Sequence, residues 1–193
     1  MSTLLEIAKK YNTDKEWSHN YISGFYEELF SPYREKNITF VELGVQNGYS
    51  MQTWREYFSN AKLIGIDVDS NETTKNLDNT ELLIGDGYSF EVCEKVPNAD
   101  IMIDDGPHHL PFQCKFLSLY LPKLNKGGVL CIEDIYDLGA ESHYPSGSML
   151  DIFSSWDEIV NVISSLSNKK FETGFVRTNN VIDSQIYFVK RID

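Results

Sequence analysis

Short apolar runs alternate with amphipathic stretches along most of this 193-residue chain. Five apolar runs predict strands, at 39–43, 62–66, 81–84, 100–103 and 129–132. Stretches with helical spacing predict helices between them, at 49–58 and 110–124. Short apolar strands separated by helices are typical of a parallel sheet that is covered on both faces. The pattern therefore predicts an α/β fold of the doubly wound, Rossmann-like kind.

The two ends of the chain depart from this alternation. Thr3 and Glu6 have the spacing of a capping box, which predicts a short helix, and residues 12–20 read as a loop. Apolar residues at helical spacing predict a second helix from Tyr21 until Pro32 closes it. We therefore expect one domain, 1–193, in which residues 1–35 form a helical lid or substrate segment.

The last third begins with a loop by composition at 137–149, followed by a helix at about 150–166. Two further runs, 171–178 and 185–190, predict a C-terminal antiparallel strand pair. The sheet is then mostly parallel and seven-stranded. The pair Gly127–Gly128 is expected to break the helix that precedes strand 129–132.

Charge and cysteine content narrow the classes of function. The formal net charge is −12, which argues against a nucleic-acid surface and against electrostatic binding to anionic lipid. The cysteines at 93, 114 and 131 lack any CxxC spacing, which predicts reduced thiols and a cytoplasmic protein. We expect no signal peptide, since the first residues have neither a basic start nor an apolar run. No apolar stretch is long enough to predict a bilayer crossing.

The segment 41–50 joins the first strand to a glycine loop that opens a helix, the arrangement of a nucleotide-type pocket. A dinucleotide fingerprint would place glycines at 44, 46 and 49, but Gln46 and Tyr49 stand there. No Lys-Ser/Thr pair follows, so the loop is not a phosphate-gripping P-loop. Glu42 would repel a pyrophosphate and attract an ammonium or sulfonium group, as S-adenosylmethionine (SAM) carries. The alternative is an ordinary strand–turn–helix whose glycines serve the turn.

Acidic residues end every predicted strand of the parallel part. They are Glu42, Asp67, Asp86, Asp104, Asp105, Glu133 and Asp134. Parallel strands present their carboxyl ends to one crevice, where so many acids repel one another unless cations or donors are present. Asp67 is placed to hold ribose hydroxyls, a role that serves NAD and SAM alike. Asp86 could reach an adenine amino group, or it could cap a helix.

The stretch 104–109, Asp-Asp-Gly-Pro-His-His, adds candidate metal chemistry. Asp105, Glu133 and Asp134 supply three carboxylates from adjacent strand ends, a donor set that suits Mg²⁺. His108 lies three residues beyond Asp105, close enough to act beside such a metal, whereas His109 suits a helix cap. Zinc is disfavoured because the cysteines lie elsewhere.

With these residues in place, the chain resembles class I SAM-dependent methyltransferases from about residue 10 to 135. It is most similar to the metal-dependent O-methyltransferases of macrolide deoxysugars, with related cephalosporin-hydroxylase-like and rhamnosyl O-methyltransferase sequences. The matching stretches are Thr13-Asp14-Lys15, His19-Asn20-Tyr21, Val41-Glu42-Leu43-Gly44, Gly65-Ile66-Asp67, Asp104 to His109 and Ile132-Glu133-Asp134. The resemblance implies Mg²⁺ on Asp105, Glu133 and Asp134. Pro107 departs from the serine common in that family, and the macrolide enzymes carry a large extra N-terminal domain.

The resemblance implies a SAM-dependent O-methyltransferase for a hydroxyl of a sugar or related small molecule, assisted by Mg²⁺. His108 and Asp105 are the expected catalytic residues, with His143 as a reserve base. The expected cofactor-binding residues are Glu42, Gly44, Gly48, Ser50, Asp67, Asp86 and Asp104. The expected acceptor residues are His19, Tyr21, His143 and Tyr144.

Other functions stay open at this point. The acceptor could be a phosphoryl or phosphoramidate oxygen, a nucleotide-linked intermediate, or a catechol-like phenol, although Glu133-Asp134 departs from the catechol ligand pattern. A non-catalytic nucleotide-binding subunit and a dehydrogenase are further alternatives. Aromatic residues near the N-terminal helix, Tyr26, Phe30 and Tyr33, could form a homodimer face or a lid.

Overall fold

In the computed structural model, which describes residues 1–70, 72–135, 149–181 and 183–193, the core is one mixed sheet. Its spatial order is β3-β2-β1-β4-β5-β7-β6. The parallel strands are β1 (Thr39–Leu43), β2 (Lys62–Asp67), β3 (Thr80–Ile84), β4 (Ala99–Asp104) and β5 (Leu124–Ile132). β7 (Gln185–Arg191) runs antiparallel between β5 and β6 (Phe171–Arg177). This confirms the predicted fold class.

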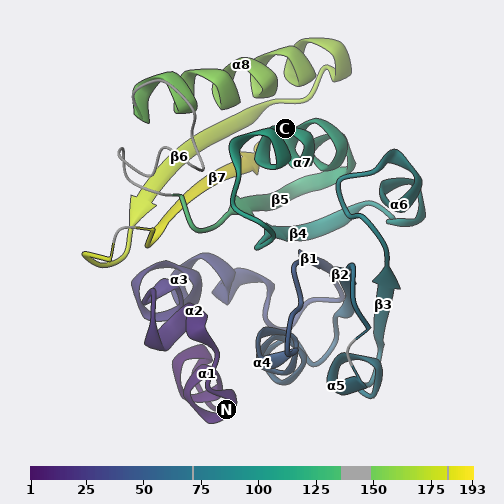
Figure 1. The fold of residues 1–193 in the computed structure, drawn as a ribbon, viewed down its shortest axis with the longest axis vertical. Helices are drawn as coiled ribbons and strands as arrows, with labels where there is room; N and C mark the ends of the chain where they lie inside the picture. Colours follow the sequence, from purple (N-terminus) through teal and green to yellow (C-terminus); the bar gives the residue numbers. More distant parts are fainter. Residues whose placement is uncertain (71, 136–148, 182) are drawn as a thin grey trace.

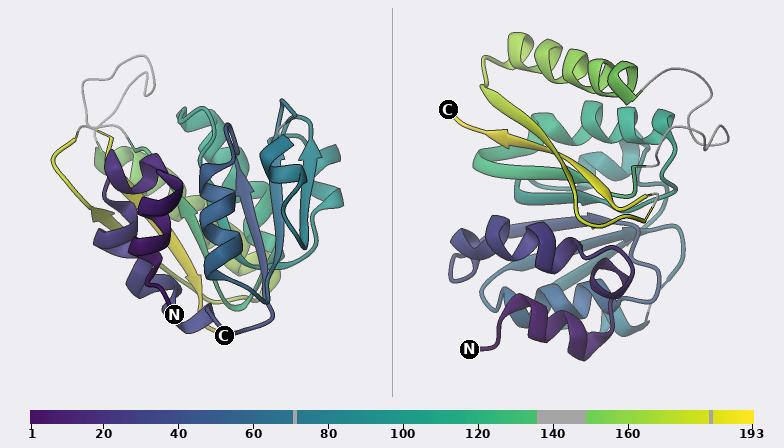
Figure 2. Two further views of the ribbon diagram at one scale, coloured as in Figure 1. Left: turned by 90° about the horizontal axis from the view of Figure 1, so that it is seen from below. Right: turned by 90° about the vertical axis from the view of Figure 1, so that its left-hand side faces the viewer.

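Helices cover both faces of the sheet (Figure 1, Figure 2). One face carries α6 (Phe90–Lys95), α7 (Leu110–Tyr120) and α8 (Met149–Ser167), whose buried residues include Val92, Phe116 and Trp156. The other face carries α1 (Leu4–Tyr11), the turns that follow it and α4 (Tyr49–Tyr57), with Tyr26, Phe30 and Trp54 in its core. The short α5 (Glu72–Lys75) lies beside β3.

The N-terminal segment is built from short helical pieces rather than one long helix. α1 begins at the predicted capping box, in which Thr3 accepts from Glu6 N–H and the Glu6 carboxylate accepts from Thr3 N–H. After α2 (Asp14–Trp17), a π-helical turn (Ile22–Tyr26) leads into α3 (Glu27–Phe30). The backbone amides of Leu4 and Leu5 donate to the Glu27 carboxylate at 2.9 and 3.0 Å, which ties α1 to α3.

Two sequence predictions about element boundaries were wrong. Residues 12–20 contain the helix α2, because Asn12 and Asn20 adopt left-handed backbone angles that turn the chain before and after it. The pair Gly127–Gly128 lies within β5, which begins at Leu124 opposite Ala99 of β4. The helix before it ends at Tyr120 and passes through a 3₁₀ turn (Leu121–Lys123) into the strand.

Register places the carboxyl ends of the central strands level with one another. Leu43 of β1 lies opposite Ile66 of β2 and Asp104 of β4, and Asp104 in turn lies opposite Ile132 of β5. The strand order reverses between β1 and β4, so the crevice of this sheet opens at the end of those two strands. In the part of the chain that the structure describes, no helix combines the length and apolarity that a bilayer crossing requires.

Candidate active site

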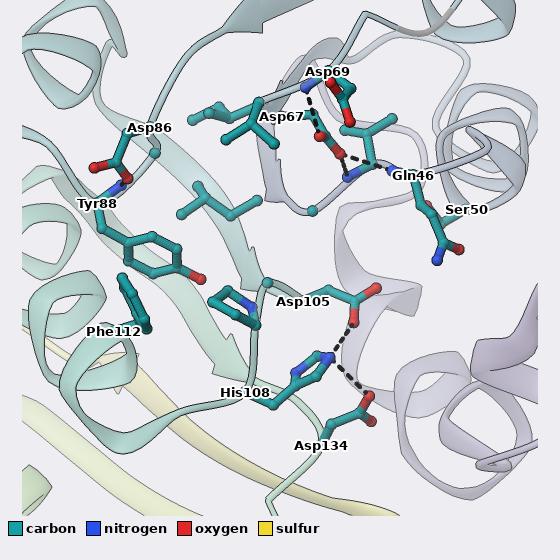
Figure 3. A pocket seen from close by; sticks show the side chains of 18 of the residues that line it. Gln46, Ser50, Asp67, Asp69, Asp86, Tyr88, Asp105, His108, Phe112 and Asp134 are labelled. Atoms are coloured by element: carbon teal, nitrogen blue, oxygen red, sulfur yellow. Dashed lines mark hydrogen bonds and ion pairs between the residues drawn. The ribbon is translucent and has the colours of Figure 1, made fainter. Parts of the chain in front are cut away.

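A cavity of about 730 Å³ opens at the carboxyl ends of β1, β2, β3 and β4 (Figure 3). The sequence-predicted residues that line it are Gly44, Ser50, Asp67, Asp86, Asp105, His108 and Asp134. Those that do not line it are His19, Tyr21, Glu42, Gly48, Asp104 and Glu133. His143 and Tyr144, also predicted as site residues, lie outside the described residues.

The glycine loop forms one wall of this cavity because it can press against the end of β4. Gly44 has φ +82°, and a Cβ built on it would lie 1.8 Å from the carbonyl oxygen of Asp105. The amide of Asp105 donates to the Leu43 carbonyl at 2.9 Å on the neighbouring strand end. Only glycine permits this approach in a left-handed conformation. Gly48, also at positive φ, is the N-cap of α4 and lies outside the cavity lining.

Asp67 holds the loop from the end of β2. Its Oδ2 accepts from the amides of Val45 and Gln46 at 2.8 and 2.9 Å, and its Oδ1 accepts from Asp69 at 3.0 Å. Burial alone would raise the pKa of Asp67, but these amides together lower it below its ordinary value. A carboxylate that is ionised at neutral pH therefore lies on the cavity wall, where it can also accept from ligand hydroxyls.

Two aromatic residues that sequence reasoning did not assign to the site form the opposite end of the cavity. Tyr88 and Phe112 both line it, with ring centroids 5.0 Å apart, close to Asp86 (Figure 3). The Tyr88 amide donates to Asp86 Oδ1 at 2.9 Å, and its hydroxyl donates to Asp104. The available signal was an aromatic residue directly after Gly85-Asp86-Gly87, because a planar ring beside a turn can support a flat ligand.

Glu42 and Asp104 were expected at the cofactor, but the structure places both beneath the cavity wall. Glu42 is fully buried and accepts from Ser50 Oγ at 3.0 Å and Trp54 Nε1 at 3.1 Å. Burial raises its pKa to about 7, although Lys15 opposes the shift. Burial also raises the pKa of Asp104 to about 7. These acids shape the wall instead of contacting the cavity.

The cation that the converging acids require is Lys15, on α2. Its side chain is 2% exposed, and its ammonium donates to Asp105 Oδ2 at 2.6 Å and to Glu133 Oε2, with Glu42 Oε1 at 3.2 Å. Burial alone would lower the pKa of Lys15, but these three carboxylates raise it well above its ordinary value. The lysine is therefore charged. It lies in Thr13-Asp14-Lys15, a stretch that the resemblance marked without giving it a role.

Glu133, predicted as a metal ligand, lies one step behind the cavity. Its Oε2 accepts from Lys15, and its Oε1 accepts from the Tyr26 hydroxyl at 2.6 Å. Burial is the main cause that raises its pKa well above the ordinary value. Both oxygens thus have protein donors, and the side chain is 1% exposed.

Asp105, His108 and Asp134 bring their side chains together inside the cavity (Figure 3). His108 Nε2 lies 3.4 Å from Asp134 Oδ2 and 4.0 Å from Asp105 Oδ1. One ligand atom from each residue lies within 4.8 Å of the others, and two carboxylate oxygens with an imidazole nitrogen fit a divalent cation. Burial lowers the pKa of His108, so the imidazole is neutral near pH 7.

His108 and Asp134 both hold left-handed backbone angles, with φ of 57° and 53°. Non-glycine residues adopt this region seldom, and surrounding structure must stabilise it. At Asp134 the support comes from Tyr21, whose phenol oxygen lies 2.6 Å from Oδ1 and accepts from the Asp134 amide at 3.1 Å. Burial raises the pKa of Asp134 to about 7.

His19 and Tyr21, expected to close over an acceptor, lie behind Asp134 instead. His19 Nδ1 is 3.0 Å from Ser184 Oγ, and its ring stacks on Tyr21 at 5.0 Å between centroids. Tyr21 is fully buried. From the N-terminal segment, Asp14 lines the cavity.

The sequence of this chain was compared with those of known proteins. No protein-family model matches the chain. An 8-demethyl-8-alpha-L-rhamnosyl tetracenomycin-C 2'-O-methyltransferase of Streptomyces olivaceus is 27% identical over 143 residues, 68% of this chain and 37% of the relative. The mycinamicin VI 2''-O-methyltransferase of Micromonospora griseorubida is 23% identical over 203 residues, 95% of this chain and 50% of the relative. The chain is related to sugar O-methyltransferases. It spans half or less of the length of these relatives.

Solved structures confirm the fold. The MycE methyltransferase, in complex with Mg, SAH and mycinamycin VI, matches with a TM-score of 0.75 and 20% identity over 99% of this chain and 55% of its own. The Methanococcus jannaschii fibrillarin pre-rRNA processing protein matches with a TM-score of 0.59 and 17% identity over 82% of this chain and 67% of its own. The Rossmann-like arrangement with a C-terminal antiparallel pair, as predicted from the sequence, is therefore the fold that this chain shares with these structures.

Proposed function

We propose that this protein is a SAM-dependent O-methyltransferase for a hydroxyl group of a sugar or sugar-bearing small molecule, assisted by a divalent cation. One observation carries the proposal: a single cavity connects the glycine loop and Asp67 to the Asp105–His108–Asp134 group. A cofactor at one end and an acceptor at the other would share this space. The relatedness to sugar O-methyltransferases supports the acceptor class.

The cofactor end is assigned from the cavity lining. Asp67 would accept from the ribose hydroxyls, and the Tyr88–Phe112 pair beside Asp86 would hold the adenine ring. Gly44 and Ser50 would flank the methionine part, where the loop passes over Asp105. With the cofactor in this position, its sulfonium methyl group would lie on the side of the cavity that His108 lines.

The acceptor end is assigned from charge and proton affinity. Asp105 and Asp134 would hold Mg²⁺, with Glu133 kept behind them by Lys15 and Tyr26. When bound, the cation would lower the pKa of the acceptor hydroxyl. His108 is neutral and faces the cavity, so its Nε2 can take the hydroxyl proton. His108 cannot use Nε2 to bind the metal and to take this proton at the same time. If Asp105 and Asp134 hold the metal, the imidazole is left free to act as the base.

The remaining parts of the proposal concern organisation and location. We propose one domain, 1–193, whose segment 1–35 supplies Asp14 to the cavity and Lys15 to its wall. The described thiols of Cys93, Cys114 and Cys131 are free, which supports a cytoplasmic location. A homodimer stays a prediction. Tyr26 and Phe30, two of the three aromatic residues considered for its face, are fully buried within this chain and cannot form that face.

The test begins with calorimetric titration of SAM and S-adenosylhomocysteine, with and without Mg²⁺, and NAD as the comparison ligand. Micromolar binding of SAM but not NAD is expected, and no SAM binding under either condition would refute the proposal. Transfer of a labelled methyl group to a panel of sugars and sugar nucleotides then tests the acceptor class.

The base assignment needs a matched pair of variants. His108→Ala should lose at least about 100-fold in methyl transfer while SAM binds normally. His109→Ala removes the adjacent imidazole, which does not line the cavity, and should keep most of the activity. Equal activity of the two variants would refute the role of His108.

A further inference from the structure

Lys15 is a buried lysine whose ammonium is surrounded by carboxylates. Among the buried residues that the structure describes, it is the one lysine or arginine. The ammonium contacts carboxylates from three separate strand ends: Glu42 of β1, Asp105 after β4 and Glu133 after β5. A lone helical turn, α2, therefore delivers a positive charge to the centre of an acidic site.

Asp105 connects this ammonium to the candidate cation position. Its Oδ2 accepts from Lys15 at 2.6 Å, whereas its Oδ1 faces His108 Nε2 at 4.0 Å, within the group that could hold a metal. One carboxylate is thus shared between a resident cation and the position of an exchangeable one. Two positive charges on opposite oxygens of the same carboxylate repel each other.

The charge balance explains what the lysine does without a metal. Glu42, Asp105, Glu133 and Asp134 lie together, and buried carboxylates without a partner are strongly destabilising. Lys15 supplies the positive charge that a metal-free site needs to keep this arrangement. The same charge must then oppose any divalent cation that binds beside Asp105.

We propose that Lys15 is a resident counter-cation that holds the carboxylates in place in the metal-free protein and lowers the affinity of the site for a divalent cation. The inference rests on the proposed divalent-cation site. It assigns Lys15 a positioning role, since its ammonium lies behind the cavity and does not line it.

The experiment compares wild-type protein with Lys15→Met, which keeps an unbranched side chain of nearly the same length without its charge. Metal-free Lys15→Met should melt at a lower temperature than wild type, and it should bind Mn²⁺ about tenfold or more tightly. Mn²⁺ should therefore raise its melting temperature by more than it raises that of wild type. A purely structural lysine would lower stability and leave the Mn²⁺ affinity unchanged or weaker, which would overturn the inference.

Two controls separate charge from general effects. Lys15→Arg keeps the charge and should bind Mn²⁺ with nearly wild-type affinity. Lys10→Met removes an exposed lysine of the neighbouring helix, paired with Glu56, and should change neither quantity. If Lys15→Met binds Mn²⁺ no more tightly than Lys10→Met, Lys15 does not oppose the cation.

A measurement on wild-type protein covers the case in which Lys15→Met does not fold. In NMR spectra of protein labelled with ¹⁵N at its lysine side chains, the buried Lys15 ammonium should give a signal that is protected from exchange with solvent. This signal should shift as Mg²⁺, used here because it is diamagnetic and Mn²⁺ is not, saturates the site. An unmoved Lys15 signal at saturation would overturn the inference but leave the proposed metal site intact. Absence of cation binding by both wild type and Lys15→Met would overturn both.

Discussion

Replacement of Asp104 by asparagine should change the free energy of unfolding in a way that depends on pH. The difference between the variant and wild type should shift in favour of the variant as the pH rises from acid to neutral. Asp104 is 2% exposed, and its Oδ2 has no hydrogen-bond partner among the described residues. Burial raises its pKa from 3.8 to about 7. Asparagine imitates the neutral acid, keeping an oxygen for the Tyr88 hydroxyl.

The sign follows from proton binding. Because the folded protein holds this proton more tightly than the unfolded chain, the associated stability is fully present below pH 3.8 and is lost as pH rises to about 7. A difference of roughly 3 pKa units at about 1.36 kcal/mol each corresponds to about 4 kcal/mol. Asp104→Asn does not undergo this loss. The unpaired amide of asparagine costs about 1–3 kcal/mol at every pH and shifts the whole curve without changing its slope.

The assay is urea unfolding of metal-free protein between pH 4 and pH 8, followed by tryptophan fluorescence and circular dichroism. The free energy of unfolding of Asp104→Asn minus that of wild type should rise by up to about 4 kcal/mol across this range. Asp67→Asn is the control. The pKa of Asp67 is lowered below 3.8, so its stabilising contribution is present throughout this range and is lost only as pH falls from 3.8 through the folded pKa, and the difference between Asp67→Asn and wild type should stay nearly flat from pH 4 to pH 8. A difference for Asp104→Asn that stays flat with pH would refute the reasoning.

Three further predictions concern the cavity wall, a buried donor behind it and the cap of the N-terminal helix. Gly44→Ala should weaken SAM binding at least about tenfold in calorimetry, because its Cβ would lie 1.8 Å from the Asp105 carbonyl at a strained backbone angle. Tyr26→Phe removes the donor to Glu133 and should lower the free energy of unfolding by about 1–3 kcal/mol in urea titrations. Thr3→Ala removes the N-cap of α1 and should cost about 1 kcal/mol, with unchanged SAM affinity.

The sequence predicted the edge of the sheet where the site lies, since parallel strands that end in acids must present them together. It did not predict which acid of each adjacent pair reaches the cavity. Asp105 and Asp134 line it, whereas Asp104 and Glu133 are buried behind it. Successive residues at a strand end point to opposite sides, so a single residue of register decides the outcome. A run of apolar residues does not locate the end of a strand to within a single residue.

Lys15 could not be assigned from its local pattern either. The repulsion among seven strand-end acids did require cations or donors, but the stretch that carries Lys15 read as a polar loop. Its burial depends on contacts with residues 27, 90 and 118 positions further along the chain. Such a partner is visible only when the α2 turn is placed against the strand ends. The resemblance to the methyltransferase family included the stretch Thr13-Asp14-Lys15, but it did not explain why a lysine is needed there.

The dependence of the site on its N-terminal segment limits how the protein could be divided or recombined. Removal of residues 1–35 would take away one ammonium and the phenols of Tyr21 and Tyr26, leaving Glu133 and Asp134 without three of their described donors. A chimaera that exchanges this segment to alter acceptor choice must therefore carry over Lys15 and both tyrosines. Sequence drift in the segment is constrained in the same way, since changes at these positions must be matched at the strand ends that they neutralise.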